Sequence, residues 1–586
     1  MKSSKIIVID SGIANYSKAY SQVIESYSVA QINGKVVITP CESRDYIGHG
    51  SAVGQIICDQ DSQASIISFR ICHGEADINE DVLLATLQYI WQSVDADIIN
   101  ISAGVTFSYK CRELHDICVK LHEKGMLMIA AFDNGGAISY PAMFDEVIGV
   151  DIVRSYNNRD EIIVSQNGIV NVSVPERYYR ARYAGKMEIL KGTSFACAYI
   201  TGLISKKRRS LGTELTKTEV LNYIKTSEVV FPNNQRNYPW FKIKKAIIFP
   251  LVKETHALLR FDDLLPFQIV GVYDERLAGR VGETFFGYEV QSYDSINWDD
   301  DFDTVILSCT QQLSKLTHRP YSEEIVKMAH KHNKNIYSFE KVDNCSDKYY
   351  YPEVTTSSIP HRNNNKLHQC VIPVVGVWGT SSKQGKYTLQ LEMIRRLKRI
   401  GYYTGHIATE PSGYLFDSDF VFHCGYNADL PIEPWECTTL LNQEMWEIQN
   451  RGKDIVITGG QSGVIPYSNL FVEPFFEYQY AYLMGVRPDF NILCINPHDD
   501  SGYVKKTCDF ISSMTEEGVC AIVLFPVQAI ETVTGVGYST KKLSTDEQKY
   551  LKERYTKKYG IPVYLLDFEE ELDLLCNSVI DFFSEE

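Results

Sequence analysis

The sequence predicts an α/β protein of 586 residues made of three consecutive domains. Short apolar runs rich in β-branched residues alternate with helical stretches, a pattern typical of parallel sheets covered on both faces. Hydrophobic residues make up 44% of the chain and aromatic residues 12%, which indicates core-forming material throughout. Segments rich in Pro, Asn, Ser and Tyr at residues 231–239 and 343–369 are predicted linkers.

The first domain is assigned to residues 1–240 and opens with an apolar run at residues 5–9. This run is typical of a buried parallel strand, and it ends at Asp10. A helix of small residues is predicted directly after His49, and a second one begins at Ser194, within the sequence Gly-Thr-Ser-Phe-Ala. The dipole of that second helix favours negative charge that develops at its N-terminus.

An Asp, a His and a Ser in these positions can perform nucleophilic catalysis. A serine hydroxyl is a poor nucleophile unless a neutral imidazole accepts its proton, so Ser194 is the candidate nucleophile and His49 its base. Asp10 is the candidate acceptor that orients the other ring nitrogen of His49. The order Asp, His, Ser along the chain resembles that of the subtilisin-like serine proteases, the peptidase S8 family.

This resemblance implies a three-layer parallel-sheet domain and assigns further residues. Asn134, in the segment Phe-Asp-Asn-Gly-Gly, resembles the side-chain donor that this family aims at the oxyanion, beside the backbone N–H of Ser194. The segment at residues 98–104 resembles the strand and edge that bind the substrate backbone, which gives the candidate substrate-binding residues Ser102, Ala103 and Gly104.

The first domain also departs from the family pattern. Ala198 and Tyr199 stand where the family usually has Pro and His after the nucleophile. Both positions lie behind Ser194 in the predicted helix, so we expect altered packing and intact chemistry. Each candidate residue alone could be ordinary turn or core chemistry, but four in family order predict an active enzyme rather than a degenerate pseudoprotease.

Composition and the N-terminus predict a cytoplasmic enzyme. The chain enters its first strand almost at once, which leaves no room for a signal peptide or a prodomain, and no apolar run approaches the ~20 residues of a membrane span. Fifteen cysteines without CxxC spacing fit a reducing compartment. A net charge of −16 disfavours nucleic acid as a partner.

A second, Rossmann-like domain is assigned to residues 245–345. Apolar strands are predicted at residues 268–272, 304–308 and 335–338, with a helix over 322–332. Because no GxGxxG sequence follows the first strand, no dinucleotide is assigned.

The third domain, residues 370–586, is predicted to be a P-loop NTPase-like α/β domain. A strand at 371–378, a glycine-bearing loop and a helix over 389–400 make a cradle for phosphate, in which backbone N–H groups and a lysine face the anion. Tyr387 occupies the usual magnesium-binding hydroxyl position. The candidate phosphate-binding residues are Gly379, Thr380, Gly385, Lys386 and Thr388.

Residues 245–586 resemble the DUF1611 family, which also pairs a Rossmann-like with a P-loop domain. The resemblance rests on the GTxxxxGKxT loop and on the segments at residues 408–413 and 455–463. It implies a phosphate-bearing ligand, a nucleotide or coenzyme A, with N-acyl transfer to amino acids as one reaction. An unliganded glycine loop is the alternative.

Together these features predict a cytoplasmic serine endopeptidase that needs no cofactor for proteolysis and acts on a peptide or precursor peptide. The architecture resembles proteases that mature ribosomally made peptides such as bacteriocins; general intracellular protein turnover is an alternative. A third hypothesis makes the C-terminal module a nucleotide- or acyl-CoA-dependent transferase and the first domain its peptide-binding scaffold. No metal ligand and no membrane contact are assigned, and the sequence carries no signal for an oligomeric state.

Overall fold

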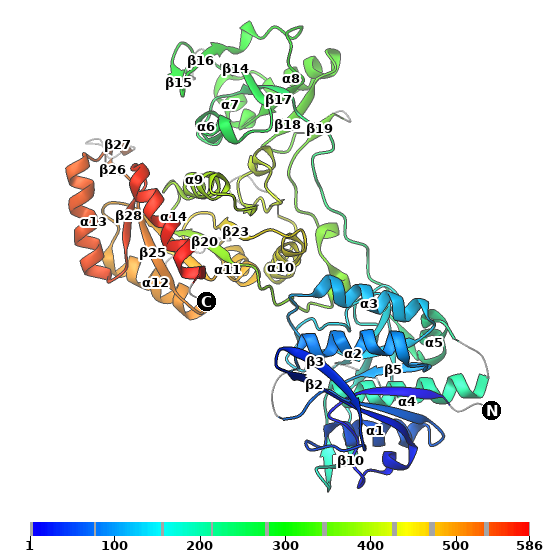
Figure 1. Cartoon of the computed structure of the whole chain (residues 1–586). Coiled ribbons are helices and arrows are strands. Elements are labelled where there is room, and N and C mark those ends of the chain that lie inside the picture. The colour runs from blue at the N-terminus through cyan, green and yellow to red at the C-terminus, as the bar shows by residue number, and fades with distance from the viewer. Residues whose placement is uncertain are drawn as a thin grey trace. The chain divides into compact units, whose positions relative to one another are not determined.

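The computed structural model describes residues 4–74, 78–102, 104–153, 158–211, 215–275, 280–342, 348–424, 430–467, 475–531 and 538–584 (Figure 1). The chain forms two compact units. The first contains residues 1–234 together with 360–371, and the second contains residues 235–359 together with 372–586. The α/β class predicted from the sequence is confirmed.

The first unit is built on a ten-stranded sheet with the order β12-β8-β9-β7-β6-β5-β1-β4-β2-β3. Neighbouring strands from β9 to β2 run parallel, and so do β8 and β12, whereas β3 is antiparallel to β2 and β8 is antiparallel to β9. The strands are β1 (Lys5–Asp10), β2 (Val23–Ile32), β3 (Lys35–Pro40), β4 (Ser65–Arg70), β5 (Ile98–Ile101), β6 (Leu127–Ala131), β7 (Val147–Val153), β8 (Ile163–Val164), β9 (Val172–Pro175) and β12 (Ser227–Glu228), with a separate hairpin of β10 (Tyr179–Tyr183) and β11 (Lys186–Leu190).

Helices cover both faces of this sheet, which makes three layers (Figure 1). Helices α1 (His49–Gln60) and α4 (Thr193–Leu211) share one core cluster with the strands, and α5 (Lys217–Ile224) adds to it. Helices α2 (Glu80–Ser93) and α3 (Cys111–Glu123) lie on the opposite face. Five of the six residues of β1 are buried, as expected for a central parallel strand covered on both faces.

The start of helix α1 depends on Gly48. Its φ of 102° lies in the left-handed region, and a Cβ atom there would meet the backbone nitrogen of Ala184 at 2.2 Å. The glycine therefore lets the N-terminus of α1 approach the β10–β11 hairpin. Since β1 ends at Asp10 and α1 begins at His49, this local geometry sets the two residues beside each other.

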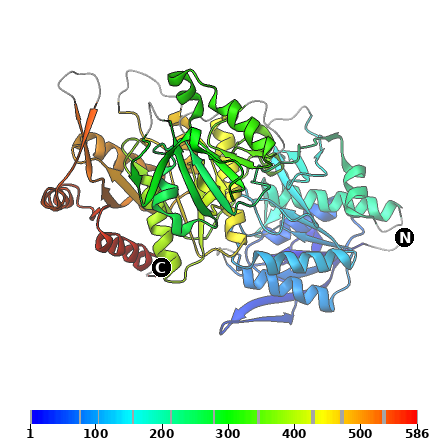
Figure 2. The ribbon, with the colours of Figure 1, turned by 90° about the horizontal axis from the view of Figure 1, so that it is seen from above.

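The second unit contains two seven-stranded sheets. The first has the order β15-β16-β14-β13-β17-β18-β19 and is parallel except for the β15–β16 pair. Figure 2 shows its strands in green. Its elements are β13 (Lys245–Phe249), α6 (His256–Arg260), β14 (Gln268–Asp274), β15 (Thr284–Phe285), β16 (Tyr288–Ser292), β17 (Thr304–Leu307), α7 (Thr310–Thr317), α8 (Tyr321–Lys331), β18 (Asn335–Ser338) and β19 (Tyr349–Tyr350).

The second sheet of this unit has the order β22-β21-β23-β20-β24-β25-β28 and is parallel throughout. The glycine-bearing loop follows its central strand, β20. Its elements are β20 (Val374–Gly379), α9 (Lys386–Arg399), β21 (Thr404–Ala408), β22 (Phe420–Val421), α10 (Pro434–Asn450), β23 (Ile455–Gly459), α11 (Phe475–Val486), β24 (Phe490–Ile495), α12 (Ser501–Met514), β25 (Val519–Leu524), a hairpin of β26 (Val527–Glu531) and β27 (Tyr538–Lys542), α13 (Thr545–Tyr559), β28 (Val563–Leu565) and α14 (Glu569–Ser584).

An apolar cluster joins the two sheets of the second unit. Phe261 and Tyr337 from the first sheet share this cluster with Leu391 and Phe416 from the second. The buried hydroxyl of Tyr337 also donates a hydrogen bond of 2.7 Å to the carbonyl oxygen of Pro411. The Rossmann-like and P-loop parts therefore form one folded body.

Candidate active site and phosphate-binding loop

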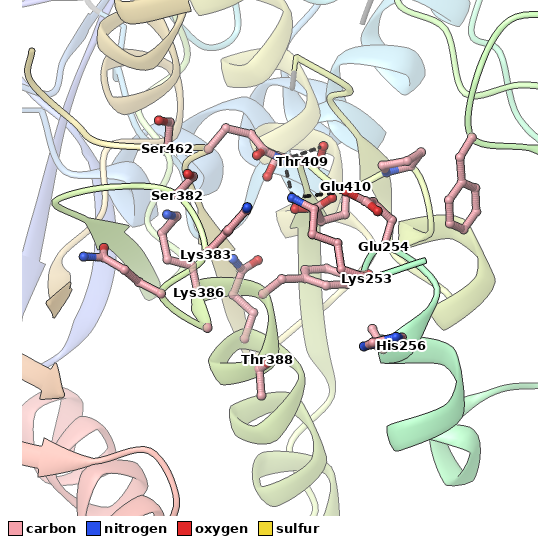
Figure 3. Close-up of a pocket in the computed structure, with 18 of the residues that line it drawn as sticks. Lys253, Glu254, His256, Ser382, Lys383, Lys386, Thr388, Thr409, Glu410 and Ser462 are labelled. Carbon is pink, nitrogen blue, oxygen red and sulfur yellow. Dashed lines mark hydrogen bonds and ion pairs between the residues drawn. The ribbon is translucent and has the colours of Figure 1, made fainter. Parts of the chain in front are cut away.

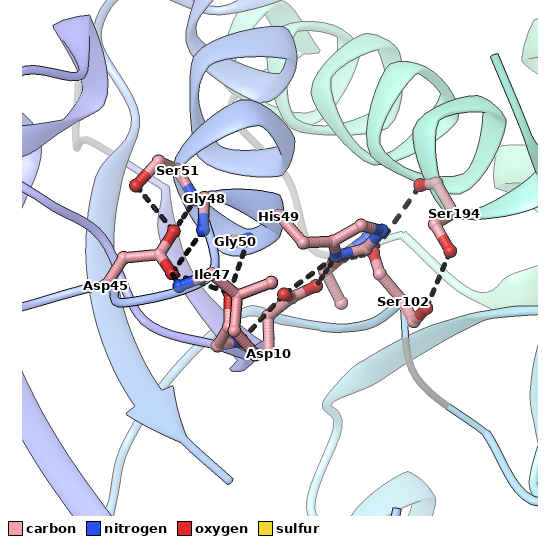
Figure 4. A network of polar contacts seen from close by, with 11 residues as sticks. Asp10, Asp45, Ile47, Gly48, His49, Gly50, Ser51, Ser102 and Ser194 are labelled. Carbon is pink, nitrogen blue, oxygen red and sulfur yellow. Dashed lines mark hydrogen bonds and ion pairs between the residues drawn. The ribbon is translucent and has the colours of Figure 1, made fainter. Parts of the chain in front are cut away.

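Asp10 and His49 form a hydrogen-bonded pair in the first unit (Figure 4). The Nδ1 atom of His49 lies 2.8 Å from Oδ1 and 3.0 Å from Oδ2 of Asp10. The Asp10 carboxylate is buried, and its Oδ1 also accepts a 2.7 Å hydrogen bond from the backbone N–H of Ser11. With Nδ1 donating to this carboxylate, Nε2 is left as the proton acceptor of the neutral ring.

Asp45 holds the N-terminus of helix α1, and the sequence analysis did not identify it. Its buried carboxylate accepts from the backbone N–H groups of Ile47, Gly48 and Ser51 at 3.0, 2.7 and 2.8 Å. It also accepts from the hydroxyls of Ser11 at 2.9 Å and Ser51 at 2.6 Å. The sequence did contain a signal for this role of Asp45, because an Asp just before a helix commonly accepts hydrogen bonds from the free N–H groups of its first turn.

The environment of His49 raises the pKa of its imidazole above the usual 6.5. Burial acts to lower the pKa, but the negative charge of Asp10 and the hydrogen bond to it outweigh this effect, and Asp45 adds to the raising. The imidazolium that forms during proton transfer is therefore stabilised by the same carboxylate that orients the ring.

Ser194 lies in the first turn of helix α4, beside the His49 ring. The ring of the next residue, Phe195, is 5.1 Å from that of His49, and Ser194 and His49 line the same cleft. The Ser194 hydroxyl donates a 2.8 Å hydrogen bond to the carbonyl oxygen of Ser102. Both Ser194 and His49 are among the described residues, and no hydrogen bond joins them in this structure (Figure 4).

Asn134 lies next to the start of the same helix. Its Oδ1 accepts hydrogen bonds from the backbone N–H of Thr193 at 3.0 Å and from the Thr193 hydroxyl at 3.2 Å. With its oxygen engaged in this way, Asn134 presents Nδ2 as a donor. The backbone N–H of Ser194 follows that of Thr193 in the chain, so the hydrogen bonds of Asn134 to Thr193 bring the two predicted oxyanion donors close to each other.

The cleft at these residues has a volume of about 1000 Å³. Of the candidate substrate-binding residues, Ser102 and Gly104 line this cleft, and Ala103 lies outside the described residues. A Cβ atom at Gly104 would meet the carbonyl oxygen of Tyr140 at 2.9 Å, which explains the need for glycine. Val105 and Tyr140 exchange two backbone hydrogen bonds of 3.0 and 2.8 Å, which close the wall behind Gly104.

The glycine-bearing loop of the second unit runs from the end of β20 at Gly379 to helix α9. This helix begins at Lys386, earlier than the predicted Leu389, because Gly385 adopts a left-handed conformation and caps it. The Lys386 ammonium donates a 2.6 Å hydrogen bond to the carbonyl oxygen of Ser381. Burial lowers the pKa of Lys386 to about 8.

Thr380 has a different environment from the one expected of a phosphate ligand. Its buried hydroxyl donates to the carboxylate of Asp499 and accepts a 2.6 Å hydrogen bond from Gln384. Thr388 lies in the first turn of α9 and lines the pocket beside the loop. Tyr387 stands at the usual magnesium-binding position, and its hydroxyl accepts a 3.3 Å hydrogen bond from the hydroxyl of Ser412.

This pocket has a volume of about 530 Å³ and is lined by both sheets of the second unit. Three ammonium groups surround it, those of Lys253, Lys383 and Lys386 (Figure 3). Glu410 faces them, and burial raises the pKa of its carboxyl group. Lys253 and Glu410 were not among the residues predicted from the sequence, although both follow the carboxyl ends of parallel strands, where ligands of such sheets bind.

Two family models match this chain. Residues 1–240 match the subtilase family, and residues 363–567 match the P-loop domain of a family of unknown function, DUF1611. The minor extracellular protease Epr of Bacillus subtilis (strain 168) is 28% identical over 218 residues, which cover 34% of this chain. The match spans only 31% of that relative's length.

Solved structures match each part of the chain as well. A DUF1611 family protein from Anabaena variabilis is 13% identical with a TM-score of 0.42, covering 58% of this chain and all of that one. A lanthipeptide protease is 17% identical with a TM-score of 0.31, covering 37% of this chain and 78% of that one. Of the helices within the described residues, none combines the length and apolar character that crossing a membrane requires. The chain thus carries a serine protease domain of the peptidase S8 (subtilase) family at its N-terminal end and a DUF1611 P-loop domain at its C-terminal end.

Proposed function

We propose that the first unit is a serine endopeptidase in which Asp10, His49 and Ser194 act as a catalytic triad. The observation that supports this most directly is the 2.8 Å contact between Asp10 and His49 Nδ1 in a cleft that Ser194 also lines. A hydroxyl, an imidazole and a buried carboxylate in this order are the groups that acyl transfer needs.

In this mechanism Ser194 first turns from the Ser102 carbonyl toward His49. Nε2 of His49 accepts the hydroxyl proton while Oγ attacks the carbonyl carbon of the peptide. The oxyanion accepts hydrogen bonds from Nδ2 of Asn134 and the N–H of Ser194. His49 then gives the proton to the leaving amine, which leaves an acyl-enzyme, and the same residues hydrolyse that ester with water.

The substrate class we propose is a ribosomally made precursor peptide that is cut in the cytoplasm. A cleft of about 1000 Å³ accommodates an extended peptide segment rather than a single side chain. Cys118 and Cys494 are buried free thiols in the two units, which fits a reducing compartment. Proteolysis by this mechanism needs no cofactor.

For the second unit we propose a phosphate-bearing ligand, a nucleotide or coenzyme A. The N-terminus of α9 and three ammonium groups face one pocket, which suits an anionic group. When bound, such a ligand would bring its phosphates against Lys386, whose ammonium group now bonds to the carbonyl oxygen of Ser381. The Thr380 hydroxyl is engaged with Asp499 and its backbone N–H with the carbonyl oxygen of Cys494, so we do not propose Thr380 as a phosphate donor.

A second candidate function follows from Glu410 in the same pocket. A buried carboxyl group with a raised pKa is suited to accept a proton from an amine nucleophile. In that case the second unit is a transferase and the first unit holds its peptide substrate. The two hypotheses differ in whether Ser194 is an activated nucleophile.

Labelling with a fluorophosphonate probe separates these hypotheses. We expect the full chain to be labelled at Ser194, and Ser194→Ala and His49→Ala to lose the label while remaining folded. Ser210→Ala, an exposed serine of the same helix, is the matched control and should be labelled like the wild type. Absence of labelling in the wild type would contradict the protease assignment and favour the scaffold hypothesis.

A further inference from the structure

Residues 360–371, here called the strap, pack on the first unit although they follow the Rossmann-like part of the chain. Most of this segment falls in the linker predicted from the sequence at residues 343–369. Backbone hydrogen bonds fix it at two points: the N–H of Ile169 donates to Arg362 at 3.0 Å, and the N–H of Ile138 donates to Leu367 at 2.9 Å.

Charged side chains of the strap anchor it further. The Lys366 ammonium forms a 2.8 Å ion pair with Asp151, and both side chains are largely buried. Lys366 also lies over the ring of Phe132, 5.3 Å from its centroid. Arg362 pairs with Asp145 at 3.2 Å and donates to the carbonyl oxygen of Asn167.

Two of these anchors flank the loop that carries the proposed oxyanion donor. Phe132 and Ile138 flank residues 133–137, which include Asn134. The next contact follows at Tyr140, whose buried hydroxyl lies 3.2 Å from Nδ1 of the buried His368. The strap therefore supports one wall of the substrate cleft from behind.

The last described contact of the strap reaches the cleft itself. Gln369 lines the cleft together with Gly104, Val105 and Thr106. Its Oε1 accepts a 2.5 Å hydrogen bond from the hydroxyl of Thr106. With the oxygen occupied, the Nε2 group remains available as a donor to a substrate.

The charges around Gln369 favour a substrate carboxamide over a substrate carboxylate as its hydrogen-bond acceptor. Asp133, Glu80 and Asp81 also line the cleft, and Lys110 is paired with Asp81. Negative charge in the cleft disfavours a substrate carboxylate. A neutral carboxamide has a carbonyl oxygen to accept from Gln369 and an NH₂ group to donate to nearby acceptors.

We propose that Gln369 is a specificity-determining residue, and that it selects substrates with Asn or Gln immediately before the scissile bond. This inference rests on the proposed protease function. Ser194, Asp133 and Gln369 line the same cleft, and Gln369 contacts its wall at Thr106, so in this proposal the side chain before the scissile bond reaches Gln369 from the backbone beside Ser194.

The test compares peptide substrates that differ only at the residue before the scissile bond, with Asn, Gln, Asp, Lys or Leu there. With the full-length wild type we expect kcat/KM for Asn or Gln to exceed that for Leu by about tenfold, the effect of one or two hydrogen bonds. The side chain of the Leu substrate makes no hydrogen bond with residue 369. Its cleavage therefore reports whether each variant is folded and has an active nucleophile.

Gln369→Leu has a side chain of similar size without hydrogen-bonding groups. It should lower the ratio of kcat/KM for the Asn or Gln substrate to kcat/KM for the Leu substrate to about one. Gln369→Glu exchanges the donor for an acceptor and should shift preference toward Lys, which provides a second variant if the first is unstable. Asn365→Asp, an exposed strap residue, is the matched control and should keep the wild-type ratio.

Three outcomes overturn the proposal: a wild type with no carboxamide preference, a Gln369→Leu variant that keeps it, or a preference for Asp over Asn. Failure of the protease assignment is recognised separately, because the wild type would then lack fluorophosphonate labelling and would cleave none of the peptides. Labelling together with an unchanged ratio in Gln369→Leu refutes only the specificity proposal.

Discussion

Replacing Asp45 by Asn tests how the base of the proposed triad is held in place. The carboxylate accepts five hydrogen bonds, three on Oδ1 and two on Oδ2. An Asn side chain has one acceptor oxygen. If that oxygen keeps the three donors on Oδ1, the NH₂ group faces the backbone N–H and the hydroxyl of Ser51, and two charge-assisted bonds are lost.

Each such bond contributes about 1.5–3 kcal/mol, and the Ser51 hydroxyl can turn to accept from the new NH₂ group. We therefore expect a loss of about 3 kcal/mol in the free energy of unfolding of the first unit. For a domain of this size the loss lowers Tm by about 6–12 °C. Because repulsion at Ser51 displaces the helix that carries His49, kcat should also fall by about tenfold to hundredfold.

Differential scanning calorimetry measures the change in Tm, steady-state peptide hydrolysis measures kcat, and fluorophosphonate labelling reports the reactivity of Ser194. The transition of the first unit is the one whose Tm changes when Ser194 carries the probe. Asp59→Asn is the matched control, because Asp59 lies on the same helix but is exposed and only loosely paired with Lys18 at 3.6 Å. If Asp45→Asn is labelled at the wild-type rate with an unchanged Tm, Asp45 does not position His49.

Three other predictions follow from the two sites. Asn134→Ala should leave KM nearly unchanged and lower kcat by roughly 10²–10³, measured by steady-state kinetics, because its bond forms fully only with the oxyanion; an unchanged kcat excludes it as a donor. His49 must be neutral to accept a proton, and its pKa is raised, so kcat/KM should fall with decreasing pH around a midpoint above 6.5. In Asp10→Asn, where burial remains and the charge is gone, the residual activity should show a lower midpoint; an unshifted midpoint argues against the pair. Lys386→Ala should weaken binding of ATP, GTP or coenzyme A in calorimetry at least tenfold, whereas Lys398→Ala, near the other end of α9, should not; equal weakening by both would indicate a nonspecific charge effect.

The sequence predicted those parts of the candidate sites that depend on local pattern. Asp10 ends an apolar strand, His49 starts a helix after Gly48, and Ser194 lies in the first turn of another helix, so each position is visible within about ten residues of chain. The parallel sheets were predictable for the same reason, since buried strands are continuous apolar runs.

Contacts between distant segments were not predictable in this way. Gln369 meets Thr106 across 263 residues, and Thr380 meets Asp499 across 119 residues. No local pattern marks either partner, because a single hydrogen bond places no constraint on neighbouring residue types. Thr380 was a candidate phosphate-binding residue by its place in the loop, and the sequence did not indicate that its hydroxyl bonds to Asp499.

The strap also affects how the first unit can be made, both in the cell and in the laboratory. The chain leaves that unit after residue 234 and returns to it at residue 360, so the Rossmann-like part is, in covalent terms, an insertion within a folding unit. During synthesis the wall behind Asn134 can form only after the ribosome has released residue 371. A gene fragment that stops at residue 240 omits this wall, whereas one that joins residue 234 to residue 360 through a short flexible segment encodes the unit in full.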